Sequence, residues 1–378
     1  MFLTVRTRGR TFARTMTRSP DTTDITDTLE SWDAGGADLD ALRHALAELP
    51  GFAGLPVSAL EPMRAKGLNH AHVRIRGTGA VLRIPRLSAF GFDPEANLAY
   101  QETCFSRAAG SGHVPRHMAT IAPRDGIPWG ALVISEVLGG TPAIPDSLPA
   151  IAQALAALHA LPVPDGPARA PIPAHADPVA STLSVIEAQA AFLPDAGLDP
   201  AARAQLDEEL DRARALAAGL SAADIPVTLV GTDTHPGNFM QQIDGAAIFV
   251  DLEKMLYGAP AIDLAHATVY TSTMWDADVA TALTAADVAA FYDAYFDAVP
   301  AGLGDRIRPL CGPLRRFTWL RTTTWCAKWK VQSRDGAAWS DMQHDPAYIA
   351  SVRSRVADYF DPATIEAIRA GFDTNDGL

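Results

Sequence analysis

Residues 229–240 read Leu-Val-Gly-Thr-Asp-Thr-His-Pro-Gly-Asn-Phe-Met, and residues 250–253 read Val-Asp-Leu-Glu. The first stretch carries Asp233 and Asn238, and the second carries Asp251. A carboxylate can orient a hydroxyl group and accept its proton, while amide and carboxylate oxygens are the hard ligands that Mg²⁺ prefers. The pattern therefore predicts a catalytic base at Asp233 and metal ligands at Asn238 and Asp251.

The residues around this pattern predict a loop and a strand end. Residues 227–230 are short and rich in β-branched side chains, and residues 246–250 are again apolar. Between them, Asp244-Gly245 is a turn signal. We therefore expect Asp233 and Asn238 on a loop, and Asp251 where a strand ends.

The spacing resembles that of known kinases. An Asp followed five residues later by an Asn, with another Asp on a later strand, is the catalytic-loop arrangement of protein kinases. More specifically, the segment resembles the aminoglycoside phosphotransferase and choline kinase superfamily, whose signature is His-Gly-Asp-Leu-His-Pro-Gly-Asn, then Ile-Asp-Trp/Phe-Glu, Tyr-Gly-Asp-Pro and Asp-Leu-Ala. The matching pieces here are Thr-His-Pro-Gly-Asn at 234–238, Val-Asp-Leu-Glu at 250–253, Tyr-Gly-Ala-Pro at 257–260 and Asp-Leu-Ala at 263–265.

The chain departs from this signature at two places. Gly231-Thr232 stands where the family has His-Gly, and Ala259 stands where it has the Asp of Gly-Asp-Pro. Neither change removes a carboxylate or amide from the predicted chemistry. Both could alter how the loop is braced.

The resemblance implies an α+β, two-lobed protein-kinase-like fold, with a small antiparallel β-sheet N-lobe and a larger, mostly helical C-lobe. We expect the nucleotide-binding N-lobe over 36–137 and the C-lobe, with the catalytic loop and acceptor pocket, over 138–378. Residues 1–35 are rich in Arg and Thr at their start, which looks like a transit peptide, but we interpret them as a disordered or flexible extension, or as translation from an upstream start codon.

The resemblance also implies the nucleotide contacts. Arg83 replaces the usual Lys of the phosphate-binding strand, although an exposed strand arginine is the alternative interpretation. Glu102, in the predicted helix 93–109, is expected to pair with Arg83. Glu95 is its competitor, because residues seven apart share a helix face. Asn69 would contact phosphate or form a turn.

The strand predicted from residue 131 leads into the expected hinge, whose backbone would bind the purine edge at Glu136 and Val137. Leu82 and Val137 are the expected walls of the base pocket. Three further residues are expected to support the site rather than react: His235 by packing or hydrogen bonding, Glu253 beside the metal, and Asp263 by bracing the catalytic loop.

In the superfamily the C-terminal helices build the acceptor pocket. Asp276 is the acid that we expect to meet an amine, with Trp275 and Trp325 as aromatic walls. Cation–π contacts of this kind contribute roughly 0.5–2 kcal/mol each. Most aromatic residues of the C-terminal third are nevertheless expected to be core.

Composition limits the partners. A net charge of −13 disfavours nucleic acid and is compatible with a cationic small molecule. No apolar run reaches the roughly 18 residues of a membrane span, so no membrane partner is expected. Three scattered cysteines do not form a disulfide framework, and a reducing cytoplasm is the expected location.

Together these observations predict a kinase that uses Mg²⁺ and moves the γ-phosphoryl of ATP or GTP to a hydroxyl of a small, cationic molecule, such as an amino alcohol or an aminoglycoside-like compound. The alternatives are a nucleotide-binding pseudokinase that acts as a scaffold, or a sugar or macrolide kinase of the same fold. The sequence leaves open the acceptor, the choice between ATP and GTP, and the oligomeric state.

Overall fold

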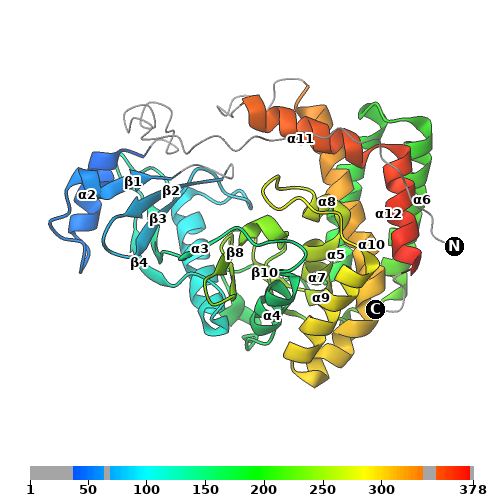
Figure 1. Cartoon of the computed structure of the whole chain (residues 1–378), viewed down its shortest axis with the longest axis horizontal. Helices are drawn as coiled ribbons and strands as arrows, with labels where there is room; N and C mark the ends of the chain where they lie inside the picture. Colours follow the sequence, from blue (N-terminus) through cyan, green and yellow to red (C-terminus); the bar gives the residue numbers. More distant parts are fainter. Residues whose placement is uncertain (1–36, 64–68, 335–345, 375–378) are drawn as a thin grey trace, which may run out of the picture. The chain divides into compact units, whose positions relative to one another are not determined.

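The computed structural model describes residues 37–63, 69–334 and 346–374. The extension predicted at 1–35 lies outside them. An antiparallel sheet in the order β1-β2-β3-β5-β4 occupies the first part (Figure 1), as predicted. Its strands are β1 Leu60–Pro62, β2 His70–Ile75, β3 Ala80–Pro85, β4 His117–Ile121 and β5 Ala131–Ser135.

The β2–β3 hairpin forms around Gly77-Thr78-Gly79, and glycine-rich turn residues between two short apolar runs are the sequence signal of a hairpin. Gly77 has φ 76° and Gly79 has φ 65°, a left-handed backbone that glycine adopts without steric cost. The two strands pair from His70 opposite Pro85 to Ile75 opposite Ala80. This register places Arg83 opposite His72, and so fixes which side chains lie beside Arg83.

Two helices accompany the sheet, α2 Leu39–Ala47 and α3 Pro94–Ala108. The α3 helix begins at Asp93, whose side chain accepts a hydrogen bond from Ala96 N at 2.8 Å, and Pro94 occupies the first turn, where no N–H is required. The residues of α3 that are buried include Asn97, Gln101 and Phe105, spaced by four. One face of α3 therefore packs inward, and Gln101 lies on it.

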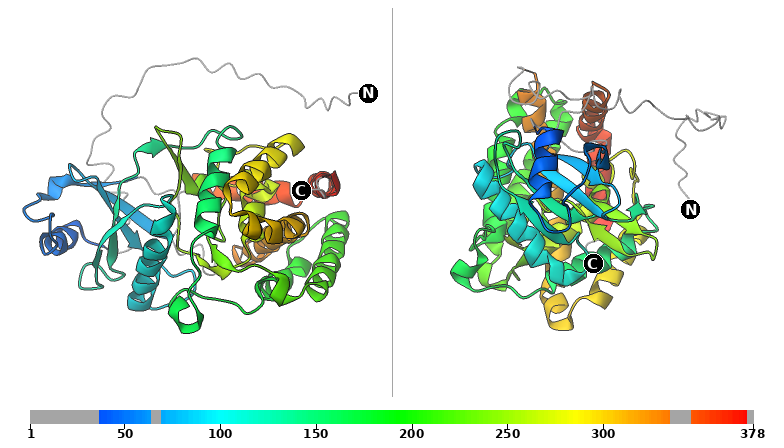
Figure 2. Two further views of the ribbon diagram at one scale, coloured as in Figure 1. Left: turned by 90° about the horizontal axis from the view of Figure 1, so that it is seen from below. Right: turned by 90° about the vertical axis from the view of Figure 1, so that its left-hand side faces the viewer.

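Helices make up most of the remainder of the chain. The long α10 packs against α5, α7 and α8, and α4 packs against α9 (Figures 1 and 2). Their bounds are α4 Leu148–His159, α5 Pro178–Ala190, α6 Pro200–Gly219, α7 Pro260–Thr268, α8 Tyr270–Thr273, α9 Ala285–Ala298, α10 Ala301–Gln332, α11 Pro346–Tyr359 and α12 Pro362–Thr374. None of the described helices combines the length and the apolarity that crossing a bilayer requires.

Short strands position the catalytic loop. β7 Thr228–Val230 pairs with β10 Leu256–Gly258, and β8 Phe239–Gln242 lies between β6 Gly139–Gly140 and β9 Ala247–Phe249. A single 3₁₀ turn, Pro236–Asn238, connects the loop after β7 to β8. Asp233 and Asn238 therefore lie on a loop and Asp251 just beyond a strand, as the sequence predicts.

Candidate active site

Asp263, in the first turn of α7, anchors the loop after β7 through hydrogen bonds. The Asp263 carboxylate is fully buried and accepts hydrogen bonds from Gly231 N at 2.7 Å and Thr232 N at 2.8 Å. His159 Nε2 donates to the same carboxylate at 3.2 Å, and Thr234 Oγ1 donates to the Asp263 carbonyl at 2.8 Å. Four donors thus converge on one residue, which fixes the backbone next to Asp233.

Thr232 adopts a backbone conformation that is costly for its residue type. Its φ of 59° lies in the left-handed region, where a β-branched side chain is strained. The family signature has glycine here, which meets no such penalty. The threonine hydroxyl makes a compensating contact, because Oγ1 donates to the Lys254 carbonyl at 2.8 Å.

Asp233 lies among nitrogen-bearing side chains. Lys254 Nζ is 2.6 Å from Asp233 Oδ2, while His266 Nε2 and His235 Nε2 lie 3.8 and 4.0 Å from Oδ1. Burial alone would raise the pKa of Asp233, but the positive charge of Lys254 beside it outweighs burial and holds this pKa well below its usual range. Asp233 is therefore an ionised carboxylate, suited to accept a hydrogen bond from a hydroxyl.

His235 shapes the loop. Its Nδ1 accepts a hydrogen bond from Gly237 N at 3.2 Å, so the ring caps the 3₁₀ turn that follows. Burial lowers the pKa of His235, which keeps the ring neutral and its Nδ1 able to accept.

Asn238 and Asp251 come together across the loop and the end of β9. Asn238 Nδ2 donates to the Asp233 carbonyl at 2.8 Å, and the Asn238 carbonyl accepts from Val250 N at 2.9 Å. The amide is thereby oriented with its nitrogen toward the loop, and Oδ1 remains as the oxygen for a ligand. The Asp251 side chain is 27% exposed, so its carboxylate can also be reached.

Arg83 contacts the metal-ligand candidate directly. The guanidinium is buried, forms an ion pair with Asp251 through Nη2, and donates to the Val250 carbonyl at 3.4 Å. Its Nη2 also lies 3.2 Å from His70 Nδ1. An exposed strand arginine, the alternative interpretation, is therefore wrong.

The pairing expected between Arg83 and Glu102 is not formed. The Glu102 carboxylate accepts from Thr120 Oγ1 at 2.8 Å, and Glu95 lies exposed at the start of α3. Both glutamates share a helix face, as expected, but it is not the face that packs toward Arg83. Gln101 lies on that face and reaches Arg83 through His70, whose Nε2 is 3.1 Å from Gln101 Oε1.

The predicted base-pocket wall at Leu82 also needs correction. Successive strand residues face opposite sides of a sheet, so Leu82 faces away from Arg83 and Val81 shares its side. Val81 belongs to the large hydrophobic core that includes Ile134 and the helical part of the chain. Val81, and not Leu82, therefore lies on the side of the sheet that carries Arg83.

The hinge residues follow β5. Glu136 accepts from Arg74 Nε at 2.7 Å, and its backbone N–H donates to the Gly79 carbonyl at 2.8 Å. Because that N–H is already used, a purine edge would have to find its donor further along the chain. Val137, the next residue, is half-buried.

Glu253 lies beside Asp251, one of the two metal-ligand candidates. Its Oε1 accepts from Asn69 Nδ2, and its Oε2 is buried without a hydrogen-bond partner among the described residues. Burial, with the nearby charge of Asp251, raises the pKa of Glu253 to about 7. The ligand atoms of His70, Asp251 and Glu253 lie within 4.8 Å of one another.

These donors fit Mg²⁺ through their oxygens. Asn238 and Asp251 offer hard ligands, and Glu253 Oε2, which makes no hydrogen bond among the described residues but lies 3.3 Å from His70 Nδ1, belongs to a residue close enough to Asp251 to add an oxygen directly or through water. His70 is less suitable. Burial and the charge of Arg83 hold its pKa well below its usual range, and Arg83 donates to its Nδ1, which occupies the lone pair that a metal would need.

The three residues predicted to meet the acceptor lie near the loop. A Cβ added at Gly237 would come within 2.5 Å of Asp276 Oδ2, so the Asp276 carboxylate packs directly on the catalytic turn. The rings of Trp275 and Trp325 form an edge-to-face contact, with centroids 5.5 Å apart. Arg355 of α11 lies 5.6 Å from the Trp275 ring centre, so a cation of the protein itself already contacts this ring.

Three residues near the loop were not singled out from the sequence: Lys254, His266 and Arg321. Arg321 Nη1 donates to the Thr232 carbonyl at 3.3 Å. Lys254 directly follows the Val-Asp-Leu-Glu stretch, and this proximity was the available signal. His266 and Arg321 belong to helices whose pattern indicates only core packing, so their positions become visible only in three dimensions.

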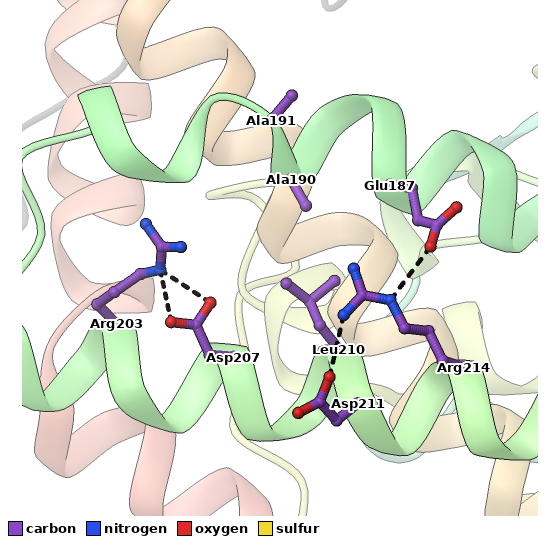
Figure 3. Close-up of a pocket in the computed structure, with 8 residues that line it drawn as sticks. All are labelled: Glu187, Ala190, Ala191, Arg203, Asp207, Leu210, Asp211 and Arg214. Atoms are coloured by element: carbon purple, nitrogen blue, oxygen red, sulfur yellow. Dashed lines mark hydrogen bonds and ion pairs between the residues drawn. The ribbon is translucent and has the colours of Figure 1, made fainter.

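A surface hollow of the described chain lies away from the predicted site residues. It lies between α5 and α6, and its charged residues pair with one another, Arg203 with Asp207 at 2.9 Å and Arg214 with Glu187 at 3.2 Å (Figure 3). None of the predicted site residues lines it.

Comparisons with known proteins show the family of this chain and the fold that it shares. The model of the phosphotransferase enzyme family matches residues 64–309. This chain therefore belongs to the phosphotransferase enzyme family, and it is an enzyme of the small-molecule phosphotransferase class. No curated protein sequence matches it significantly.

Solved structures share its kinase-like fold at low identity. An ethanolamine kinase from Plasmodium vivax is 12% identical with a TM-score of 0.57, covering 93% of this chain and 98% of its own. A choline kinase from Cryptosporidium parvum is 12% identical with a TM-score of 0.57, covering 90% and 99%. A spectinomycin phosphotransferase, solved with ADP and spectinomycin, is 12% identical with a TM-score of 0.56, covering 83% and 93%.

Proposed function

We propose that this enzyme transfers the γ-phosphoryl group of ATP or GTP to a hydroxyl group of a small molecule. One observation carries the proposal: an ionised Asp233 and the Asn238 amide lie on one braced loop, Asn238 is hydrogen-bonded to the segment that carries Asp251, and Arg83 lies against the Asp251 carboxylate. An acceptor base, oxygen ligands for a metal and a phosphate-neutralising cation are the parts that phosphoryl transfer requires.

Each side chain has a role in this proposal. Asp233 binds the acceptor hydroxyl, aims its oxygen at the γ-phosphorus and receives its proton as the bond forms. Asn238 and Asp251 hold Mg²⁺, which supplies neutralising charge for the phosphates when it is bound. Arg83 forks onto phosphate oxygens, a geometry that its planar guanidinium favours. Asp263 keeps the loop in place.

We propose that the acceptor carries an amine, as amino alcohols and aminoglycosides do. The support is Asp276, a half-buried carboxylate packed on the catalytic turn, with Trp275 next to it. The similar structures include kinases named for ethanolamine, choline and spectinomycin, which are alcohols that carry an amine or a quaternary ammonium group. A sugar or a macrolide as acceptor is the alternative that the experiment below separates.

We also propose that the enzyme works in a reducing compartment, the cytoplasm. Its three cysteines, Cys104, Cys311 and Cys326, are free and buried. Burial raises the pKa of each of these thiols to about 12, which keeps them protonated and unreactive.

A screen of ADP or GDP release tests the proposal. Purified enzyme is given Mg²⁺, either nucleotide, and a panel of amino alcohols, aminoglycosides, macrolides and sugars, with Asp233→Asn as the blank. We expect release that depends on an amine-bearing acceptor and is absent from the blank. Nucleotide binding in a thermal-shift assay without release for any acceptor would favour a pseudokinase scaffold instead.

A further inference from the structure

Lys254 has a position that neither the sequence motif nor the family match explains. Its Nζ lies 2.6 Å from Asp233 Oδ2 and 3.8 Å from Glu253 Oε1. The side chain as a whole is 37% exposed, although its ammonium group pairs with these carboxylates. The lysine therefore lies between the acceptor base and the residues beside the metal ligands.

The backbone of Lys254 is fixed from three sides. The hydroxyl of fully buried Tyr100 has one proton, which it shares between the Met255 carbonyl at 2.7 Å and the Glu253 carbonyl at 3.1 Å, one on each side of the lysine. Thr232 Oγ1 donates to the carbonyl of Lys254 itself at 2.8 Å. Because the backbone is fixed, only the flexible end of the side chain is free to move.

Lys254 is also distinct among the nitrogen groups around Asp233. Among the described residues, the ion-pair neighbours of Asp233 are Lys254, His235 and His266. Burial lowers the pKa of both histidines, that of His266 to about 3, so they are neutral near pH 7. Lys254 is the permanent positive charge at ion-pair distance from the base.

We propose that Lys254 is a catalytic residue, whose ammonium group binds an oxygen of the phosphoryl group in transfer while it remains beside Asp233. This inference rests on the proposed function. The transferred group has to move from phosphates beside Asp251 to a hydroxyl beside Asp233, and Lys254 reaches into the space between them.

The chemistry needs a charge at this place. The acceptor oxygen forms a bond to the γ-phosphorus, the bond from that phosphorus to the β,γ-bridging oxygen breaks, and the nucleoside diphosphate leaves with the electron pair. The hydroxyl proton passes to Asp233. Negative charge stays on the three phosphoryl oxygens throughout, and an ammonium group fixed beside them stabilises that charge.

The experiment compares Lys254→Met and Lys254→Gln with Lys330→Met. Met keeps the length of the stem without the charge, and Gln provides a second neutral variant in case the first folds poorly. Lys330, on α10, undergoes the same chemical change while its ammonium lies 5.6 Å from the Phe360 ring centre. Calorimetry measures the affinity of each protein for the Mg²⁺ complexes of ADP and of a non-hydrolysable ATP analogue.

We expect both Lys254 variants to bind the triphosphate analogue at least about tenfold more weakly while ADP affinity changes less than about twofold, and turnover to fall by about 10²-fold or more. Lys330→Met should match the wild type. Equal affinities for both nucleotides in wild type and Lys254 variants, with lower thermal stability alone, would make Lys254 structural and overturn the inference. Failure of the wild type to bind either nucleotide would instead overturn the proposed function.

Discussion

Replacing Asp263 should destabilise the protein strongly, because this residue holds the backbone of the catalytic loop. It has no proposed contact with the reactants. Asp263→Ala removes the acceptor for Gly231 N, Thr232 N and His159 Nε2, all of which donate to a fully buried carboxylate. Each buried donor left without a partner costs about 1–3 kcal/mol. Removing the buried charge offsets part of this cost, so we expect a loss of about 3–6 kcal/mol in unfolding free energy.

Asp263→Asn separates the charge from the shape. The amide keeps one acceptor oxygen but turns an NH₂ group toward the second backbone N–H, so we expect a smaller loss of about 2–4 kcal/mol. Urea unfolding, followed by circular dichroism, measures both values. Asp305→Asn, at an exposed position on α10, is the matched control and should stay within about 0.5 kcal/mol of the wild type. A loss below about 1 kcal/mol for Asp263→Ala would refute the idea that this residue holds the loop.

Three further predictions concern the same loop. Thr232→Gly should be about 1 kcal/mol more stable than Thr232→Ala, because both lose the hydroxyl contact and only glycine relieves the φ of 59°; equal unfolding free energies would contradict this. His266 has a folded pKa of about 3, below its unfolded value, so its contribution to stability is complete above pH 6.5 and is lost as the pH falls. At pH 5 the unfolding free energy should have fallen by about 2 kcal/mol because of His266. Urea titrations at pH 7.5 and pH 5 measure this fall, and His266→Asn should lack the part that His266 causes. Gly237→Ala should cost about 1–3 kcal/mol by overpacking against Asp276. Adding Asp276→Gly should recover most of that loss, and additive losses in the double variant would exclude the clash.

The sequence predicted the loop and the fold well because both depend on local patterns. The turn at Gly77-Thr78-Gly79, the strand before Asp251 and the Asp233–Asn238 spacing involve neighbouring residues, and the structure has each of them. The antiparallel sheet follows from the same hairpin signals. Such features need no knowledge of how distant segments pack.

The errors arose where packing decides which side chain faces the site. Glu102 and Gln101 are adjacent on α3, but the neutral Gln101 contacts His70 beside Arg83, while Glu102 contacts Thr120 instead. The misplacement of Leu82 could have been avoided, since strand alternation already puts Val81 on the side of Arg83. The role of Lys254 could not be predicted in this way. Its 2.6 Å contact with Asp233 joins residues 21 apart, and no local pattern predicts such a contact.

The most direct test of the account is the transfer of labelled phosphate. Wild-type enzyme and Asp233→Asn are incubated with Mg²⁺, γ-labelled ATP or GTP and the best acceptor from the screen, while calorimetry gives the nucleotide affinity of each. The account predicts label on a hydroxyl of the acceptor with the wild type, a rate lower by about 10²–10⁴-fold with the variant, and nucleotide affinities that differ little. Transfer by Asp233→Asn at the wild-type rate would contradict the assignment of the base, and with it the central claim.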